Sequence, residues 1–311
     1  MKVNHLTNSA KIIAEIGANH DGDMSLAKEM ICAAAENGAS YAKFQSWREQ
    51  DLKHGPWDED KPFFHYKNKR DFYKKSELLD EQHRELIDFC EKKDISFLTT
   101  CFSRSRIDFL SKLKMDSIKI ASTDSTSGSM IRELSDKFDR VIVSTGMTTN
   151  EEIKNLAGQL HELEIDFVLM HCVSIYPTPI DKISLPRMDF IKKLAEERFE
   201  MCANMPTRTL SRGKFGISDH SLGINVAIIA VARGATWIEK HFTIDNNLPG
   251  PDNKMSMLPK DLRKIREFCD DFALMQSNVS TIMPQPHNAD EIQKDESELR
   301  DSLVGRFGNN Q

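Results

Sequence analysis

The sequence lacks the features that mark membrane, secreted and thiolate-metal proteins. No run in its 311 residues approaches the roughly 18 apolar residues of a membrane helix. Residues 1–11, MKVNHLTNSAK, lack the apolar core of a secretory signal. The six cysteines include no CxxC pair, which argues against a disulfide framework or a thiolate metal site. We therefore expect a cytoplasmic protein with no membrane partner.

Positive charge is also in short supply. The 42 Lys and Arg residues are outnumbered by 48 Asp and Glu residues, the net charge is −6, and no basic stripe offsets it. A nucleic-acid partner is therefore not expected. The sequence has no internal repeat of fixed period and no GxGxxG fingerprint of a dinucleotide-binding sheet. With 39% hydrophobic residues, the chain still has enough apolar material for a sizeable core.

Strand-like and helix-like segments alternate along most of the chain. Eight strands are predicted at residues 11–17, 40–46, 95–100, 117–121, 140–144, 166–172, 214–220 and 236–242. Helices are predicted at residues 23–37, 79–93, 103–113, 149–160, 185–197, 222–233 and 259–275, and residues 47–78 are predicted to form a long loop. Eight strands separated by helices predict an α/β fold of the (β/α)8 TIM-barrel type. We expect one barrel domain over residues 1–275 and a polar tail or linker, without a second domain, over residues 276–311.

Two histidines end the last two predicted strands. His220 and His241 hold matched positions at the carboxyl ends of successive strands, and in a barrel such positions converge at the mouth, where active sites lie. A lone histidine is ordinarily a hydrogen-bonded core residue. The matched positions, with GPD at residues 250–252 just beyond, favour a functional pair. Two imidazoles beside carboxylates suit a divalent cation.

Two lysines are predicted to point into the same mouth. Strand alternation places Lys43 and Lys119 inward, because their neighbours in each strand would face the covering helices. Hydroxyl residues lie around them at or near strand ends: Thr100, Ser122, Ser144 and Ser218. This combination suits a small dianion, such as a phosphate ester that also carries a carboxylate. Glu15, in the first strand, is costly to bury unless it is paired or functional. A metal beside a bound phosphoenol would describe an aldol-type condensation.

Several short motifs occur in the order seen in one enzyme family. They are EIG (15–17), NHDG (19–22), KFQ (43–45), STGM (144–147), HCVS (171–174) with YP (176–177), SDHSLG (218–223), EKHFT (239–243) and GPD (250–252). In this order, the sequence resembles the sialic acid synthase family over residues 11–275. The resemblance implies a phosphoenolpyruvate-dependent condensation with an open-chain, N-acylated sugar aldehyde. The products would be a sialic-acid-like 2-keto-3-deoxy nonulosonic acid and phosphate.

The resemblance also assigns roles and partners. It implies that a divalent cation, Mn2+ or else Mg2+ or Co2+, is bound by His220 and His241, and that the enzyme is a homodimer. Catalytic roles would fall to Glu15, Lys43, Lys119 and the two histidines. Phosphoenolpyruvate would be held by the two lysines with Thr100, Ser122, Ser144 and Ser218. Contacts to the sugar, or help with the chemistry, would come from Glu15, Gln45, Asp124, Ser174, Tyr176 and Asp252.

The sequence departs from the family pattern in several places. Asp124 stands where a glutamate is common, Ser174 where an asparagine is common, and residues 201–212 read as an insertion. The antifreeze-like domain that follows the barrel in family members, with an arginine that covers the partner's sugar site, has no counterpart in these 311 residues. We expect the 47–78 loop to act as the substitute lid, through Arg48, His65, Lys67 or Arg70. Arg208 and Arg212 are the next candidates.

Two other functions remain open from the sequence. One is a metal-dependent barrel aldolase or condensing enzyme that acts on another aldehyde or sugar phosphate. The other is a catalytically silent, sugar-binding subunit. The presence of Glu15, both lysines and both histidines argues against a silent subunit, because a site under no selection would be expected to lose one of them.

Overall fold

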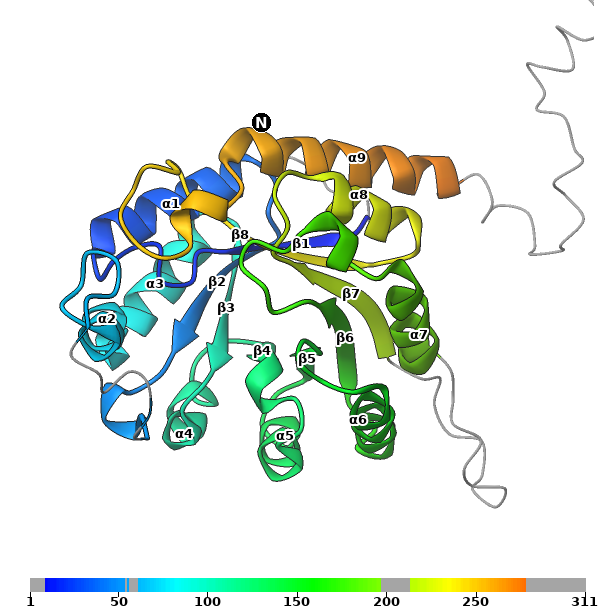
Figure 1. Ribbon diagram of the computed structural model, residues 1–311, viewed down its shortest axis with the longest axis horizontal. Coiled ribbons are helices and arrows are strands. Elements are labelled where there is room, and N and C mark those ends of the chain that lie inside the picture. Colours follow the sequence, from blue (N-terminus) through cyan, green and yellow to red (C-terminus); the bar gives the residue numbers. More distant parts are fainter. Residues whose placement is uncertain (1–8, 54, 56–60, 197–212, 278–311) are drawn as a thin grey trace, which may run out of the picture.

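Eight parallel strands close into one barrel. The computed structural model describes residues 9–53, 55, 61–196 and 213–277. The strands pair in chain order, and the eighth pairs with the first (Figure 1). They are β1 Lys11–Glu15, β2 Tyr41–Ser46, β3 Ser96–Cys101, β4 Ser117–Ile120, β5 Arg140–Ser144, β6 Asp166–Cys172, β7 Gly213–Asp219 and β8 Trp237–His241. The (β/α)8 barrel predicted from the sequence is confirmed.

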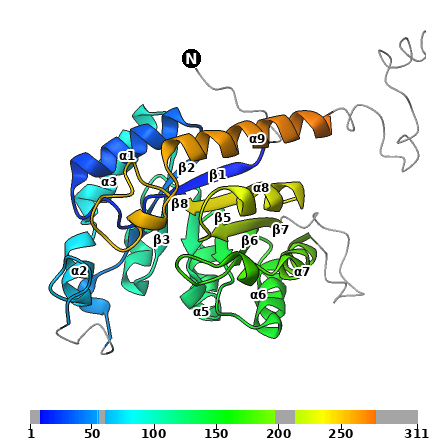
Figure 2. The ribbon, with the colours of Figure 1, turned by 45° about the horizontal axis from the view of Figure 1, so that its top comes forward.

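The helices form a ring around this barrel, as Figure 1 shows. They are α1 Met24–Glu36, α2 Lys69–Ser76, α3 Asp80–Lys92, α4 Ile107–Leu110, α5 Gly128–Ser135, α6 Asn150–Glu162, α7 Leu185–Glu196, α8 Asn225–Ala232 and α9 Pro259–Ser277. The last helix, α9, lies against α1 and α8 and so completes the ring. Helix α2 lies outside the ring beside α3 (Figure 2). Within the described residues, no helix combines the length and apolarity that crossing a bilayer requires.

Alternation along the strands sorts the side chains into two cores. Outward-facing residues such as Ile12, Phe44 and Val143 pack beneath the helices in one large apolar cluster. Inward-facing residues form a separate apolar layer inside the barrel, made of Ile13, Tyr41, Leu98, Ile142, Val168, Met170 and Trp237. Complete burial of one such side chain stabilises the fold by about 1.5–3 kcal/mol. Each strand's next inward position, one step toward its carboxyl end, therefore lies on a rigid apolar floor.

The connections differ more from the prediction than the strands do. The 47–78 loop contains α2, and the predicted helix at 103–113 is reduced to α4 with one preceding turn, Arg104–Arg106. Helix α5 was not predicted, and α8 is shorter than expected. Helix α2 is stabilised by tertiary contacts, because Phe72 packs with Trp47 in a small aromatic cluster. Helix α9 ends at Ser277, two residues beyond the proposed end of the barrel domain.

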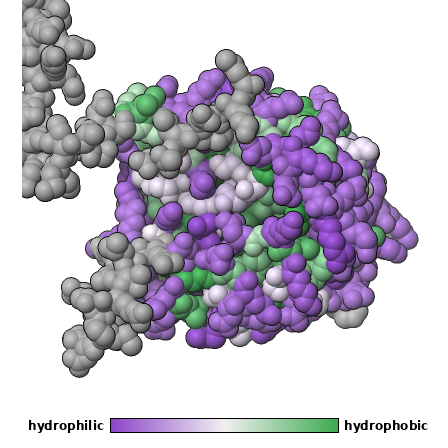
Figure 3. All heavy atoms as spheres, turned by 180° about the vertical axis from the view of Figure 1, so that it is seen from behind, coloured by the Kyte–Doolittle hydropathy of each residue, from purple (hydrophilic) through white to green (hydrophobic). Residues whose placement is uncertain are grey.

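The side of the molecule that is hidden in Figure 1 has a largely hydrophilic surface. Figure 3 shows this side covered mainly by polar residues, with small apolar areas between them. The predicted insertion at 201–212 and the predicted tail from residue 278 onward lie outside the described residues.

Candidate active site

A row of four alternating charges crosses the carboxyl end of the barrel. Lys43 Nζ lies 2.7 Å from Glu15 Oε2 and 3.8 Å from Glu239 Oε2. Glu239 Oε1 lies 3.2 Å from Lys119 Nζ. The order is therefore Glu15, Lys43, Glu239, Lys119, contributed by β1, β2, β8 and β4. All four side chains are buried, so the interior of the barrel mouth is a dry, ionic layer.

Uncharged polar side chains complete the layer. Lys43 Nζ donates to Thr100 Oγ1 at 2.9 Å, and Lys119 Nζ donates to Ser144 Oγ at 2.6 Å. The further hydrogen bonds are Gln45 Nε2 to Glu15 Oε1 at 2.8 Å and Ser218 Oγ to Glu239 Oε1 at 3.1 Å. The structure therefore brings together most of the residues predicted for the anion site.

Glu239 is a member of this layer that the sequence analysis did not assign to the site. The carboxylates beside the two lysines come from strands distant in the sequence: Glu239 is 120 residues from Lys119. One sequence signal could have identified it. Glu239 shares a strand face with His241, which the analysis did place in the mouth.

The two carboxylates of the layer respond differently to burial. Burial raises the pKa of Glu15, and the single adjacent ammonium of Lys43 only partly opposes this. Burial also acts to raise the pKa of Glu239, but Lys119 and Lys43 outweigh it and hold the pKa below its usual value. Glu239 is therefore the constant negative charge of the layer, whereas Glu15 can exchange a proton more readily.

The histidine pair lies at the edge of this layer. The ring centroids of His220 and His241 are 5.5 Å apart, and Tyr176 lies over His220 at 4.1 Å. His220 Nδ1 is 2.9 Å from the Val173 carbonyl oxygen, so this nitrogen carries a proton, and in the neutral ring Nε2 keeps a free lone pair. His241 Nδ1 is buried without a hydrogen-bond partner, and Asp252 Oδ2 lies 3.9 Å from it.

These two rings fit a cation with two protein ligands. Burial, His220 and Lys43 together hold the pKa of His241 well below its usual value, which keeps this ring in the neutral form that binds metals. Burial disfavours protonation of His220, but Cys172 and the Val173 carbonyl outweigh it and raise its pKa. Within the described residues, no cluster of three or more His, Cys, Asp or Glu side chains is arranged around one point for a metal. Any further ligands would come from water or substrate.

Gly146 forms a narrow wall of the mouth after β5. Its amide donates to Ser122 Oγ at 2.9 Å. A methyl group at this position would lie 2.3 Å from Ser174 Oγ, 2.9 Å from Ser122 Oγ and 3.2 Å from Cys172 Sγ. The position therefore has no room for a side chain, and it brings two predicted substrate-binding serines side by side.

Three predicted residues lie farther out. Asp124, in the turn Ser122–Asp124, is half-buried and accepts a hydrogen bond from Thr123 Oγ1 at 2.9 Å rather than from another predicted site residue. Tyr176 is 53% exposed. Asp252 is partly exposed beside His241. These side chains line the opening above the charged layer and not its interior.

The proposed lid cations of the 47–78 loop are already paired. Arg48 binds Glu77 at 2.8 Å and also Asp80, and Arg70 binds Glu49. Both guanidinium groups therefore fasten the loop to itself and to α3. In this conformation Arg48 and Arg70 each already have a carboxylate partner. A contact from either of them to an incoming sugar stays a prediction.

Asp21 fastens the same loop to the turn after β1. It accepts from Tyr66 Oη at 2.5 Å and from Lys75 Nζ at 2.9 Å, and it lies 3.2 Å from His65 Nε2. His65 is thus engaged as well. The other candidate cations, Arg208 and Arg212, lie outside the described residues. Residues 61–78 are therefore tied to the turn after β1 through Asp21 and to the segment after β2 through Trp47, whose Nε1 donates to the Tyr73 carbonyl.

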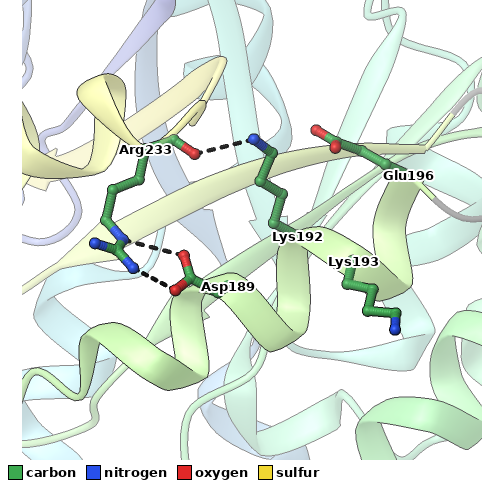
Figure 4. A pocket seen from close by; sticks show the side chains of 5 residues that line it. All are labelled: Asp189, Lys192, Lys193, Glu196 and Arg233. Carbon is green, nitrogen blue, oxygen red and sulfur yellow. Dashed lines mark hydrogen bonds and ion pairs between the residues drawn. The ribbon is translucent and has the colours of Figure 1, made fainter.

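A hollow of about 440 Å³ lies on the outside of the barrel, lined by Asp189, Lys192, Lys193, Glu196 and Arg233 (Figure 4). Arg233 forms an ion pair with Asp189, and Lys192 Nζ donates to the Arg233 carbonyl at 3.1 Å. Arg233 caps the end of α8, just before β8 begins, so this hollow lies at the amino-terminal end of the barrel. It is separate from the candidate site.

The fold and the site together define a (β/α)8-barrel enzyme with a buried ionic layer and a histidine pair at its mouth. The chain belongs to the NeuB family, whose model matches residues 30–280. It is 32% identical to the N,N'-diacetyllegionaminic acid synthase of Campylobacter jejuni, over 95% of this chain and 84% of that protein. It is 31% identical to the pseudaminic acid synthase of Helicobacter pylori, over 79% of this chain and 69% of that protein.

A solved structure agrees with this assignment. The N-acetylneuraminic acid (sialic acid) synthetase of Leptospira borgpetersenii, determined in complex with citrate, matches with a TM-score of 0.75 at 29% identity. The match covers 95% of this chain and 93% of that chain. The resemblance to sialic acid synthases drawn from the sequence motifs is confirmed.

Proposed function

We propose that this enzyme condenses phosphoenolpyruvate with an open-chain, N-acylated sugar aldehyde to give a nonulosonic acid and phosphate. Its relatives are named synthases of legionaminic, pseudaminic and sialic acids, and the enzyme is of the C–C bond-forming condensing type. The observation that carries the proposal is the pair of buried ammonium groups, Lys43 and Lys119, set beside two histidines with available ring nitrogens.

The ionic layer supplies the phosphoenolpyruvate site in this proposal. Two ammonium groups and nearby hydroxyls match a molecule that carries both a phosphate and a carboxylate. The hydroxyls are those of Thr100, Ser122, Ser144 and Ser218. An incoming anion would bind the two ammonium groups from the mouth, while Glu15 and Glu239 keep their ion pairs with the lysines. Donors held in place by the barrel need no reorganisation when charge moves during the reaction.

The cation and the acceptor come next in the proposal. His220 and His241 would hold a divalent cation, with Mn2+ proposed as the native ion, and it would polarise a carbonyl oxygen as a Lewis acid when bound. Gln45, Asp124, Ser174, Tyr176 and Asp252 would contact the sugar around the opening. We also propose a cytoplasmic homodimer in which residues 1–275 form the catalytic unit.

The chemistry follows from the two substrates. C3 of the enol attacks the aldehyde carbon and forms the new C–C bond, which leaves C2 electron-poor. Water adds to C2 and gives a tetrahedral intermediate. This intermediate expels phosphate when the bond between C2 and the bridging phosphate oxygen breaks. The raised pKa of Glu15 allows this carboxyl group to take up or release a proton near neutral pH, as the addition of water requires.

Coupled product analysis tests this function. Purified protein is incubated with phosphoenolpyruvate, Mn2+ and a panel of N-acyl hexosamines, and both phosphate release and product mass are followed. Sugar-dependent phosphate release with a nine-carbon keto acid as product is the expected result. Products formed only from other aldehydes or sugar phosphates would favour the aldolase-like alternative. Sugar binding without turnover would favour a silent subunit.

A further inference from the structure

Glu239 is the point at which the charged layer converges. Its Oε1 accepts from Ser218 Oγ at 3.1 Å and from Lys119 Nζ at 3.2 Å. Its Oε2 is buried without a hydrogen bond and lies 3.8 Å from Lys43 Nζ. The side chain is 7% exposed, so water cannot replace these contacts. One carboxylate thus lies between both ammonium groups.

Two ammonium groups in one dry site are unfavourable without such a carboxylate. Burial lowers the pKa of Lys119, and Lys43 on β2 adds to this, while Glu239 on β8 acts in the opposite direction. Cys172 on β6 and Glu15 on β1 also favour the charged lysine, but each contributes less than Glu239. Ser144 on β5 accepts a hydrogen bond from the ammonium group. Without Glu239, Lys119 would lose the largest of the negative charges that keep it protonated.

Glu15 cannot take over this task. It forms an ion pair with Lys43, and its other oxygen accepts from Gln45. Its position on β1 places it beyond Lys43 in the row, on the far side from Lys119. It also binds a proton more readily than Glu239 does, because burial raises the pKa of Glu15 to about 7, whereas the two lysines hold the pKa of Glu239 below its usual value.

We propose that Glu239 is a positioning residue that keeps Lys119 charged beside Lys43 and holds both ammonium groups aimed at the mouth, so that both bind the phosphate-bearing substrate. Glu239 acts through the lysines and does not itself contact the substrate. The identity of that anion as phosphoenolpyruvate rests on the proposed function. The role of Glu239 toward the lysines rests on the contacts alone.

The first test is the pH dependence of substrate binding. Glu239→Gln preserves the shape of the side chain and removes its charge. Calorimetric titration with phosphoenolpyruvate should show the dissociation constant about tenfold higher at pH 7.5, and higher still at pH 9, because the uncompensated lysine loses its proton as the pH rises. The wild-type constant should change much less over this range. Glu239→Asp should recover the flat pH dependence, and Glu162→Gln on the exposed end of α6 should match wild type.

A second measurement does not depend on the substrate. In protein labelled with 15N at the lysine side chains, the Nζ resonance of Lys119, assigned with Lys119→Arg, reports its protonation. The titration midpoint should fall in Glu239→Gln and return toward wild type in Glu239→Asp. If the wild-type protein binds no phosphoenolpyruvate, the proposed function fails, and this titration still decides the role of Glu239.

Two results would overturn the inference. One is an unchanged Lys119 titration in folded Glu239→Gln. The other is a loss of phosphoenolpyruvate affinity that is equal at pH 7.5 and pH 9 and is not relieved in Glu239→Asp, since this would indicate general damage to the barrel. Should Glu239→Gln fail to fold, the titration of Glu239→Asp against wild type serves as the test. Its carboxylate is one methylene farther from Lys119, so the Lys119 midpoint should fall slightly, and a midpoint identical to wild type would contradict the proposal.

Discussion

Lys43 and Lys119 lie in the same buried layer, and each contacts one hydroxyl group and at least one carboxylate. Each ammonium group is therefore held in place to bind an anion, and its charge is compensated by a neighbouring carboxylate. Removing one partner of a buried ion pair leaves the other uncompensated, which costs more than the pair contributes. A lysine substitution here should thus affect both binding and stability.

The lysine variants test the anion site directly. Lys43→Met and Lys119→Met should each weaken phosphoenolpyruvate binding by about 10- to 100-fold, since a hydrogen bond to a charged group contributes about 1.5–3 kcal/mol. Titration calorimetry measures the affinity, and thermal unfolding measures the accompanying loss of stability. Wild-type affinity in both folded variants would exclude the ionic layer as the binding site.

Gly146 provides a steric test of the same wall. Gly146→Ala places a methyl group 2.3 Å from Ser174 Oγ, so this serine or the loop after β5 must shift and turnover should fall by about an order of magnitude. Adding Ser174→Ala removes the closest clash and should restore part of the activity in the double variant. The contact with Ser122 Oγ at 2.9 Å remains, so full recovery is not expected. Wild-type turnover in Gly146→Ala would show that the residues around this position can shift without affecting catalysis.

At the scale of elements, local patterns predicted the barrel well and the connections poorly. All eight strands were predicted to within two residues at each end, because each has its own apolar pattern. Asp23, with which the predicted 23–37 helix begins, is the N-cap of α1 and accepts hydrogen bonds from the Ser25 and Leu26 amides. Helix α2 was missed because KNKRDFYKKS has little apolar periodicity. Its stability depends on Trp47, more than twenty residues earlier in the chain.

The same distinction applies to the candidate site. Histidines and lysines at strand ends could be predicted, since parallel strands bring their carboxyl ends to one side. The pairing between them could not. Which carboxylate meets Lys119 depends on barrel closure, which brings β8 across to β4, and no local pattern encodes that distance. The ion pairs of Arg48 could not be predicted for a similar reason, because Asp80 lies in another element.

The anchor at Asp21 leads to a prediction about the 61–78 segment. Asp21→Asn keeps a residue that tolerates the positive φ of 51° at this position, but it removes the charge that binds Lys75 and His65. Partly exposed pairs contribute about 0.2–1 kcal/mol each, so the loosened loop should raise the sugar KM about three- to tenfold and the phosphoenolpyruvate KM less. Proteolysis within residues 61–78 should also accelerate. Asp88→Asn on the exposed face of α3 is the control. Equal effects on both substrates would mean that this loop does not shape the sugar site.

In the whole molecule, the interior of the barrel is ionic at its carboxyl end and apolar below. Two further buried histidines lie outside the barrel, one on a helix and one in a turn. His83 on α3 is completely buried, with its Nδ1 2.9 Å from the Leu79 carbonyl oxygen and its ring near Phe97 and Phe109. His20, in the turn after β1, is 1% exposed, and its Nδ1 accepts from the Gly22 amide at 3.1 Å. Burial lowers the pKa of each to about 4. Both histidines are therefore neutral in the folded protein at neutral pH.

Because His83 is buried in its neutral form, the free energy of unfolding at acid pH reports on how well this side chain is packed. An unfolded histidine has a pKa near 6.5, so between pH 6.5 and about 4 the unfolded chain binds one more proton than the folded chain at this position. The contribution of neutral His83 to the free energy of unfolding is fully present above pH 6.5. It is lost as the pH falls, at about 1.4 kcal/mol per pH unit and about 3 kcal/mol in total.

His83→Asn can keep a donor toward the Leu79 carbonyl but cannot take up a proton. Its unfolding free energy should be lower than wild type at pH 7.5, because the ring leaves a cavity, and the difference should narrow steadily toward pH 4.5. Urea unfolding at a series of pH values measures both free energies under identical conditions, so contributions from Glu15 and the other titrating groups cancel in the difference. A difference that stays constant with pH would show that His83 takes up its proton equally in the folded and unfolded states, and that it is not sealed within the barrel's outer core.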